Sequence, residues 1–548
     1  MQKLTTYTLA GNIVDLKRNM IFKGRVLVKN DRIESVMPDD SVTEDQTILP
    51  GLIDSHIHVE SSMLIPSEFA RLAVVQGTVA TVSDPHEIAN VLGTEGVKFM
   101  IENGRKVPFK FYFGAPACVP ATPFETSGAK FGIPELEALL SMDEIKYLSE
   151  MMNFPGVINQ APEEMAKIEL ARKYHKPVDG HAPGVKGEDA RKYVQAGVST
   201  DHECFTIEEA LEKIRYGMKI QIREGSAAKN FEALIPLMKQ HADKLLFCSD
   251  DKHPDDLAEG HINQMIIRAI AKGYDPLAVL KSVIINPIEH YKLDVGMLQP
   301  GDPADMIIVD NLKDFNVKAT FINGQKVAEN GRCLIDSVKE GSPNKFFAQP
   351  ITDADIVVKD LGKQIRVIGS RDGELITGVI KLTPTVVGGN IISDVERDIL
   401  KIVVLNRYEQ AKPAMAFIKN IGIKKGAFAS SVAHDSHNIV AVGTNDHDIV
   451  QAINAIIENK GGVVVVEDGL EEILPLPVAG LMSNEDAYRV AERYKYLDKK
   501  VHELGSSLRA PFMTLSFMAL LVIPDLKLSD KGLFDGTTFS FCSLYVDA

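Results

Sequence analysis

Short strands alternate with helices from residue 49 to residue 294, and this alternation restricts the possible folds more than any other feature. Each predicted strand is a short β-branched run bounded by glycine, proline or acidic residues. Helical segments such as 162–174, 187–196 and 206–216 lie between them, the first opening with proline and acidic residues. Eight repeats of this kind are typical of a (β/α)8 TIM-like barrel in an α/β protein. The eight predicted strands are 52–59, 79–83, 109–113, 147–152, 177–181, 198–204, 219–223 and 245–249.

The segments on either side of this region predict further structure. Residues 1–48 contain short strands with turns, and Asn323-Gly324 is a strong hairpin signal between two more strands downstream. We therefore expect 1–48 and 295–340 to pair as a small β-domain built from both sides of the barrel, which itself covers 49–294. Turn-forming residues follow, and 345–548 is expected to be a C-terminal α/β domain. Its predicted elements are strands near 365–368, 401–405, 439–442 and 463–466, and a helix at 449–457.

Composition limits the partners and the compartment. The 548-residue chain has a net charge of −15, which argues against a nucleic acid or a membrane surface as partner but allows a small neutral substrate. Its five cysteines are scattered without CxxC spacing, as in reduced cytoplasmic proteins. No signal peptide is visible, and the apolar run 512–523 is too short to span a bilayer. We expect a cytoplasmic protein.

His56 and His58 lie two residues apart at the end of the first predicted strand. Side chains at i and i+2 of a strand point to the same face, so the two imidazoles can hold one metal ion. The simpler alternative is a pair of histidines that only bind nearby carbonyl groups. Because the motif is short, residues on the other strands must decide between the two.

Further polar residues follow the other predicted strands. In a barrel, the carboxyl ends of all strands face one site, so these side chains are expected to converge. Each has an ordinary explanation on its own, such as a buried, satisfied histidine or a solvated carboxylate. Together they offer nitrogen and oxygen ligands without thiolate, which suit Zn, Mn or Fe(II), and they suffice for two ions. The residues are Glu150, His181, His202 with Glu203, and Asp250 with Asp251.

Several longer motifs resemble those of the adenine deaminase family in the amidohydrolase superfamily. They include residues 50–58 (PGLIDSHIH), 83–90 (SDPHEIAN), 179–184 (DGHAPG) and 433–438 (AHDSHN). The resemblance extends over essentially the whole chain. It implies hydrolytic deamination of adenine to hypoxanthine and ammonia, a step of purine salvage, by a metal-activated hydroxide at a binuclear centre. Two divalent ions per chain are implied, Mn²⁺ or Fe²⁺ with Zn²⁺ as the alternative, and a homo-oligomer is expected.

The resemblance also implies roles for individual residues. His56 and His58 would bind one metal ion, and His181 and His202 the other. Glu150 would bridge the two ions at the end of the fourth strand, where many superfamily members use a carboxylated lysine. Asp250 would bind the first ion and accept the proton of the attacking hydroxide.

The group that protonates the purine ring is less clear from the sequence. Several related deaminases carry a glutamate shortly after the fifth-strand histidine, but here Ala182-Pro183-Gly184 follows His181. We expect Glu60 to take this role, because residues 56, 58 and 60 share one face of the strand. Weaker candidates are Glu203, Asp84, Glu87 and Glu224.

The expected substrate contacts include a segment far from the barrel. The polar stretch 434–438 reads as a loop, and we expect it to lie near the barrel mouth; a solvated surface loop is the alternative. The predicted substrate-binding residues are Glu60, Asp84, Glu203, Arg223, His434 and His437.

Two rival functions remain open at this point. One is another amidohydrolase activity, on a cyclic amide or a different nucleobase. The other is a non-catalytic purine-binding protein that has kept the fold. Such a protein would be expected to lose metal ligands, whereas all six are present in this sequence.

Overall fold

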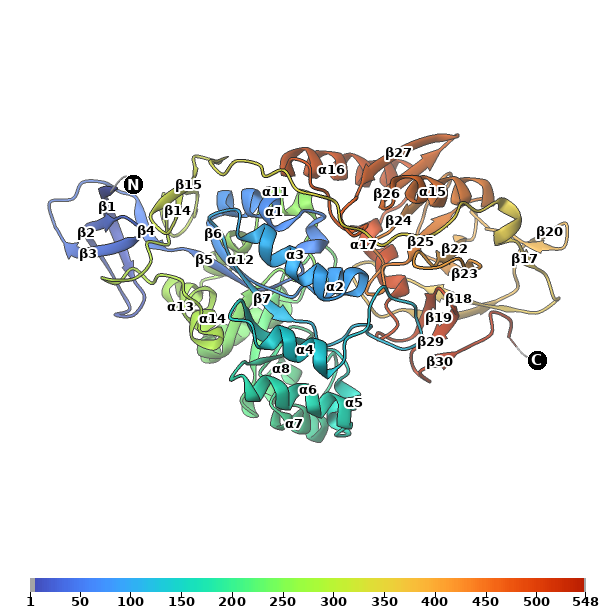
Figure 1. The fold of residues 1–548 in the computed structure, drawn as a ribbon, viewed down its shortest axis with the longest axis horizontal. Helices are drawn as coiled ribbons and strands as arrows, with labels where there is room; N and C mark the ends of the chain where they lie inside the picture. Colours follow the sequence, from blue (N-terminus) through green and yellow to red (C-terminus); the bar gives the residue numbers. More distant parts are fainter. Residues whose placement is uncertain (1–4, 547–548) are drawn as a thin grey trace.

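The computed structural model describes residues 5–546, arranged as three parts in a row (Figure 1). A β-sheet lies at one end, an α/β region in the centre and a second α/β region at the other end. One buried apolar cluster extends from the central strands into the C-terminal sheet, so these two parts share a core. Over residues 5–546, no helix combines the length and the apolar character needed to cross a membrane.

The end sheet joins the two flanks of the central region. Its eight strands follow the order β16-β15-β14-β13-β4-β1-β2-β3. β4 (Thr47–Pro50) pairs with β1 (Thr6–Asp15) on one side and β13 (Met306–Val309) on the other. The sequence predicted the pairing of the flanks but not β4, whose four residues show little alternation beside the Pro-Gly turn. The other strands are β2 (Met20–Lys29), β3 (Arg32–Pro38), β14 (Val317–Ile322), β15 (Gln325–Glu329) and β16 (Arg332–Cys333).

All eight predicted central strands are present and parallel. They form a five-stranded sheet, β5 to β9, and a three-stranded sheet, β10 to β12. Single parallel bridges connect Val178 to Val198 and Ile57 to Asp250, so each edge of one sheet meets an edge of the other. The strands are β5 (Leu52–Ile57), β6 (Thr78–Ser83), β7 (Lys110–Ala115), β8 (Ile145–Met151), β9 (Val178–Gly180), β10 (Thr200–Asp201), β11 (Lys219–Arg223) and β12 (Leu245–Cys248).

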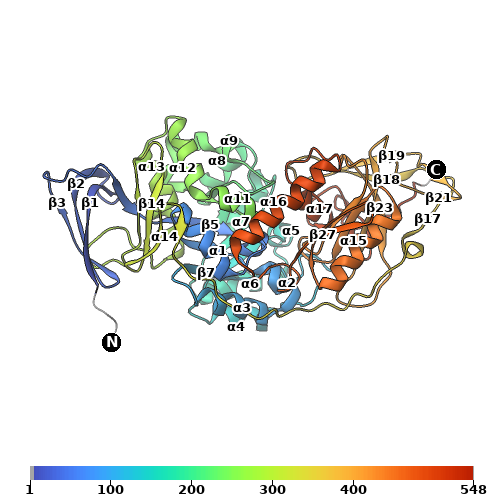
Figure 2. The ribbon, with the colours of Figure 1, turned by 90° about the horizontal axis from the view of Figure 1, so that it is seen from above.

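Helices connect these strands and lie outside them (Figure 2). α6 begins with Pro162 and two glutamates, and Thr206 caps α8 by accepting a hydrogen bond from Glu209 N at 3.3 Å. Residues 231–241 do not form one continuous helix: a 3₁₀ turn containing Pro236, which has no N–H to donate, separates α9 from α10. The helices are α1 (Pro66–Ala73), α2 (His86–Leu92), α3 (Thr94–Gly104), α4 (Ile133–Leu140), α5 (Phe154–Ile158), α6 (Pro162–Lys173), α7 (Gly187–Ala196), α8 (Ile207–Arg215), α9 (Phe231–Leu234), α10 (Met238–His241), α11 (Pro254–Glu259), α12 (Ile262–Ala271), α13 (Pro276–Val283) and α14 (Ile285–Tyr291).

The C-terminal region is built on an eight-stranded sheet of order β19-β18-β23-β22-β25-β24-β26-β27. α15 (Asp446–Asn459) covers one face, and its isoleucines are buried against the sheet. α16 (Ala487–Glu503) and α17 (Pro511–Ser516) lie between the sheet and the central region (Figures 1 and 2). The strands are β18 (Ile365–Gly369), β19 (Gly378–Leu382), β22 (Ile399–Leu405), β23 (Ala414–Lys419), β24 (Ala427–Ser430), β25 (Ile439–Gly443), β26 (Gly462–Glu467) and β27 (Leu470–Pro475).

Two smaller sheets complete this region. The first has the order β17-β21-β20 and the second β28-β29-β30. Their strands are β17 (Val358–Lys359), β20 (Val386–Val387), β21 (Asn390–Ile391), β28 (Leu526–Ser529), β29 (Gly532–Asp535) and β30 (Ser540–Phe541).

Candidate active site

Three side chains meet where the first and last central strands come together. His56 is the penultimate residue of β5, His58 follows the strand, and Asp250 lies just after β12. The Nε2 atoms of His56 and His58 are 3.4 and 3.2 Å from Asp250 Oδ1. Two backbone hydrogen bonds fix this arrangement, from Asp250 N to His56 O at 2.9 Å and from His58 N to Asp250 O at 3.2 Å.

Glu150 lies between the two pairs of histidines. One oxygen, Oε1, is 3.2 Å from His58 Nε2. The other, Oε2, is 2.8 Å from His181 Nδ1 and 3.4 Å from His202 Nε2. His181 and His202 follow β9 and β10, so a single carboxylate on β8 contacts side chains from three other strands. Glu150 therefore contacts one histidine of the first pair and both histidines of the second.

Arg223, at the end of β11, contacts two carboxylates of the site. Its Nη1 donates to Glu203 Oε1 and to Asp250 Oδ2, each at 2.6 Å, and Nη2 donates to Glu203 Oε2 at 3.0 Å. Because all three residues are almost fully buried, these charge-assisted hydrogen bonds fix the orientation of both carboxylates. Arg223 therefore links the ends of β10 and β12 across the site.

The histidines have the unsatisfied nitrogens that a cation requires. Both ring nitrogens of His56, Nε2 of His181 and Nδ1 of His202 are buried and have no hydrogen-bond partner within residues 5–546. Such groups are costly unless a ligand satisfies them. Three sets of side-chain donors lie within 4.8 Å of one another: His56, His58 and Asp250; His56, Glu150 and His202; and His181, His202 and Glu203. These residues fit divalent cations bound through nitrogen and oxygen.

The electrostatics of the site favour anionic carboxylates. Burial alone would raise the pKa of Glu150, but its hydrogen bonds to His181 and His58 hold that pKa well below the usual value. Burial acts in the same direction on Asp250, and the charge of Arg223 lowers its pKa well below the usual value. Both carboxylates are thus available as ligands and proton acceptors at neutral pH.

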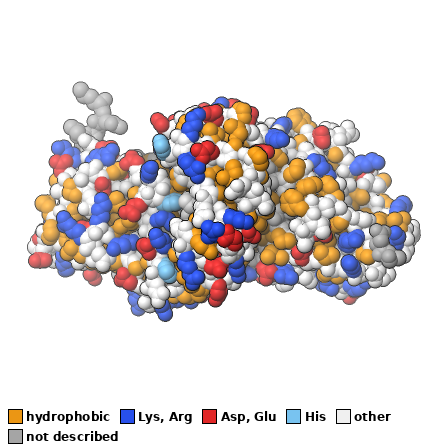
Figure 3. All heavy atoms as spheres, turned by 90° about the horizontal axis from the view of Figure 1, so that it is seen from below, with side chains coloured by type: hydrophobic (Ala, Val, Ile, Leu, Met, Phe, Trp, Pro, Cys, Tyr) orange, Lys and Arg blue, Asp and Glu red, His pale blue; other side chains and the backbone are white. Residues whose placement is uncertain are grey.

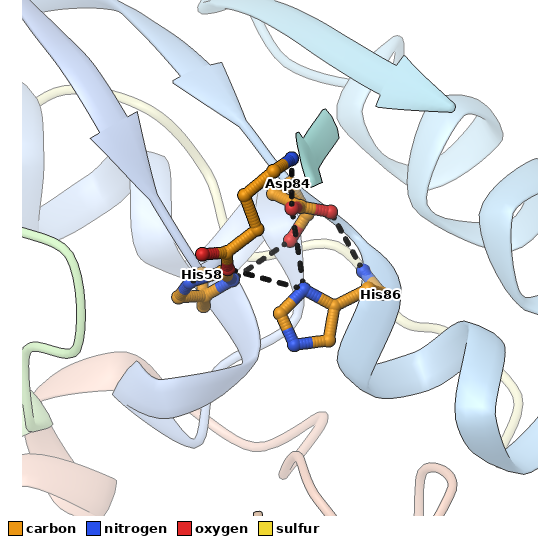
Figure 4. Close-up of side chains that lie close together, drawn as sticks. His58, Asp84 and His86 are labelled. Carbon is orange, nitrogen blue, oxygen red and sulfur yellow. Dashed lines mark hydrogen bonds and ion pairs between the residues drawn. The ribbon is translucent and has the colours of Figure 1, made fainter. Parts of the chain in front are cut away.

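His86 lies next to this cluster at the start of α2. Its Nδ1 is 3.2 Å from Asp84 Oδ2 and 3.6 Å from Glu150 Oε1. Figure 4 shows His58, Asp84 and His86 turned towards one another from the end of β5, the end of β6 and the start of α2. The side-chain donors of these three residues and Glu150 lie within 4.8 Å of one another.

The segment 434–438 reaches the site from the C-terminal region. Nδ1 of His434 lies 2.5 Å from Glu87 Oε1, and Nε2 of His437 contacts Glu87 Oε2. Glu87 is the second residue of α2 and is buried. Asp435 Oδ1 is 3.7 Å from Nε2 of His86. The distant loop therefore forms part of the site, although the sequence pattern is equally compatible with a solvated position.

A narrow cavity of about 30 Å³ lies between the cluster and the C-terminal region. Four of the residues that line it are apolar: Met152, Leu375, Phe517 and Leu520. The polar lining residues are His58, His86, Glu87, Glu150, His181, His202, Glu203, Arg223, Asp250, Asp251, His434 and Asp435.

The structure brings most of the predicted site residues together, but not in the predicted way for Glu60. β5 ends at Ile57, and Glu60 lies in a 3₁₀ turn (Val59–Ser62), so the argument from strand alternation is wrong beyond His58. Glu60 Oε1 accepts a hydrogen bond from Ile88 N at 3.2 Å, and its carboxyl does not line the cavity. Burial raises the pKa of Glu60 to about 7.

Asp84 and His437 also contact the site from behind its lining. Asp84 accepts hydrogen bonds from the backbone N–H groups of His86 and Glu150, and Nε2 of His437 contacts Oε2 of Glu87. The sequence did not identify His86, Asp435 or the apolar lining residues as part of the site. Asp435 lies between His434 and His437 in the sequence, and its position could have indicated that it belongs to the site. The apolar residues have no local sequence pattern that would indicate this.

Comparison with known proteins gives two family matches. Residues 47–327 match the amidohydrolase family, and residues 374–540 match the adenine deaminase C-terminal domain. An adenine deaminase of Methanosarcina mazei is 54% identical over 552 residues, covering 98% of this chain and 99% of its own. One of Salinibacter ruber is 54% identical over 544 residues (99% and 99%), and one of a Sulfurovum species is 55% identical over 534 residues (97% and 98%).

Proposed function

Because the chain belongs to the adenine deaminase family of amidohydrolases, we infer that its buried histidine–carboxylate cluster hydrolyses adenine to hypoxanthine and ammonia. The chain is a hydrolase with adenine deaminase activity, and the mechanism is metal-dependent. The observation that carries this conclusion is the convergence of four histidines, Glu150 and Asp250 at the ends of five strands, with donor atoms within 4.8 Å of one another in each group.

We propose that the eight central strands close as a (β/α)8 barrel. The two bridges from Val178 to Val198 and from Ile57 to Asp250 support closure, because they connect both edges of the five-stranded sheet to the three-stranded one. We further propose three domains: a β-domain of 1–48 and 295–340, the catalytic barrel of 49–294, and a C-terminal domain of 345–548. The mixed sheet of β1–β4 and β13–β16 supports the first of these.

We propose that two divalent ions, Mn²⁺ or Fe²⁺ with Zn²⁺ as the alternative, are held by six side chains. His56, His58 and Asp250 would hold one ion, His181 and His202 the other, and Glu150 both. When bound, the pair would supply a nucleophile by lowering the pKa of water towards neutrality. The chain's own contribution is to hold the ligands: Asp250 is anchored by Arg223, and Nδ1 of His58 donates to Asp84 O at 3.2 Å.

Asp250 is the proposed general base. Its Oδ1 faces the metal-binding histidines while Oδ2 is held by Arg223, so its charge is fixed at the cavity wall. From there it accepts a proton from water at the site and passes it to the departing amine. Glu60, whose carboxyl lies outside the cavity lining, is proposed as the second proton-transfer group, supported by its unpartnered Oε2 atom and by burial, which raises its pKa to about 7. Glu203, Arg223 and His434 line the cavity and are proposed to contact adenine, with Asp84 and His437 supporting them from behind.

One assay separates this function from its rivals. Purified protein loaded with Mn²⁺ should release ammonia from adenine and show near two metal equivalents per chain. Ammonia release only from cytosine, guanine or a cyclic amide would assign a different hydrolase. Adenine binding without turnover, and with no bound metal, would assign a purine-binding protein.

We also propose a cytoplasmic homo-oligomer. The five free cysteines support the compartment. Exposed apolar residues in the C-terminal region, among them Val387 at 59% and Phe539 at 48% exposure, support self-association, and Figure 3 shows hydrophobic side chains gathered on one face of this region. Light scattering of the purified protein tests the oligomer, and a monomer at micromolar concentration would contradict it.

A further inference from the structure

Three apolar side chains of the C-terminal region cover the cavity opposite the metal-binding cluster. Leu375 lies in the loop between β18 and β19, Phe517 follows α17, and Leu520 follows it three residues later. All three line the cavity. Their exposed fractions are 7%, 2% and 5%, so this cover, which we call the roof, leaves little contact with solvent.

A buried lysine holds the roof in place. Nζ of Lys527, on β28, donates to Leu375 O at 2.7 Å and to Phe517 O at 2.9 Å. Lys527 is fully buried, and within residues 5–546 no carboxylate forms an ion pair with it. Its hydrogen bonds to two carbonyls are therefore its main compensation for burial. One side chain thus joins the two separate segments from which the roof is built.

The roof is also fixed against the polar wall of the cavity. The ring of Phe517 lies 5.4 Å from that of His434, and His434 N donates to Ser516 Oγ at 3.2 Å. Next to Leu375, Thr377 Oγ1 donates to Leu526 O at 2.9 Å, which ties this loop to the start of β28. The roof therefore has little freedom to move away without breaking several buried hydrogen bonds.

The chemistry of adenine determines which edge faces the roof. Deamination occurs at C6, which must approach the metal-binding cluster, and in a purine N3 and N9 lie on the opposite side of the ring system. N9 is the atom that carries the sugar in a nucleoside. A substituent there would point at apolar side chains that offer no hydrogen bonds to hydroxyl groups.

We propose that Leu375, Phe517 and Leu520 exclude N9-substituted purines and that Lys527 is the positioning residue that keeps this roof closed. This inference rests on the proposed adenine deaminase function, and it assigns selection of the free base to the C-terminal region. A methyl-sized addition to a fitted apolar pocket changes discrimination by about 10- to 200-fold. 9-Methyladenine is therefore a minimal probe, and adenosine a larger one.

The test compares kcat/KM for 9-methyladenine with kcat/KM for adenine in each variant. Both values are measured on the same preparation, so a loss of active protein does not change their ratio. In the wild-type enzyme the ratio should be about 10- to 200-fold below one. Leu520→Ala and Leu375→Ala should each raise it by about 10-fold or more, because they remove atoms facing N9. Lys527→Met keeps the length of the side chain but removes both hydrogen bonds, and should shift the ratio in the same direction.

Lys401→Met is the matched control. Lys401 is also a fully buried lysine bound to a carbonyl, Ile356 O at 2.9 Å, and to Asp446, but none of these residues lines the cavity. Its substrate ratio should equal that of the wild type. The proposal is overturned if the wild type uses both purines equally, or if the Leu520→Ala, Leu375→Ala and Lys527→Met ratios stay at the wild-type value. Absence of adenine turnover in the wild type would instead refute the proposed function.

Discussion

Asp250→Asn is the substitution that tests the proposed base most directly. Asparagine has nearly the same shape as aspartate, and it tolerates the left-handed backbone of this position, where φ is 56°. The change removes the negative charge and places an amide group among Arg223, His56 and His58. Arg223 keeps its two hydrogen bonds to Glu203, so the strand ends remain connected.

The size of the effect follows from what the carboxylate does. A positioned proton acceptor contributes about 10²- to 10⁴-fold, equivalent to about 3–5 kcal/mol of activation free energy. Asp250 Oδ1 also lies within 3.4 Å of two histidine nitrogens, so its loss weakens the proposed first metal site as well. We therefore expect kcat for adenine to fall by at least about 100-fold even when Mn²⁺ is saturating.

The assay is steady-state ammonia release across a Mn²⁺ titration, with metal content and circular dichroism measured on the same samples. Asp256→Asn serves as the matched control, because Asp256 accepts a hydrogen bond from Ser226 at 2.5 Å but does not line the cavity. A metal-saturated Asp250→Asn enzyme with kcat near the wild-type value would refute the role of Asp250 as base and point to its neighbour Asp251.

Three further predictions concern ligands, the C-terminal contact and stability. His56→Ala and His202→Ala should each abolish adenine turnover and lower the metal content; full activity with two bound ions would remove that residue from the site. His434→Ala and His437→Ala should raise KM or lower kcat for adenine, because each removes a contact to the buried glutamate of α2; unchanged constants in both would show that the segment is structural. Burial, reinforced by nearby carboxylates, raises the pKa of Glu125 from 4.5 to about 8. Between these pH values the folded protein keeps a proton that the unfolded chain loses, so the free energy of unfolding falls as pH rises through that interval. Glu125→Gln should therefore match the wild-type Tm near pH 5 and exceed it near pH 9; a Tm difference independent of pH would contradict this.

The sequence predicted the central strands well because each is short, β-branched and bounded by turn formers. Prediction failed where local pattern does not decide the structure. The strand expected at 198–204 contains only Thr200 and Asp201, because the following residues turn away to present His202 to the site. The long helix α16 was not predicted, although Asp486 caps it by accepting from Tyr488 N and Arg489 N.

The site itself shows the same division. Ligands at strand ends were predictable, because strand direction alone determines where they meet. The roof was not predictable, because Leu375 and Phe517 are ordinary apolar residues. Their role depends on Lys527 of β28, which lies 10 residues after Phe517 and 152 residues after Leu375. Glu60 was misplaced because the sequence does not reveal that the strand gives way to a 3₁₀ turn after His58.

The sheet that joins both flanks of the central region affects how the chain folds while it is being synthesised. Strands β1 to β4 are synthesised first, but β4 finds its second partner, β13, only after residue 306 has been made. Until then β4 has an unpaired edge, and such edges promote association between chains. Pairing over this separation in sequence is also slow. During translation the N-terminal strands are thus the segment with the greatest need of a chaperone, and slowing synthesis between residues 50 and 306 should increase aggregation of the nascent protein.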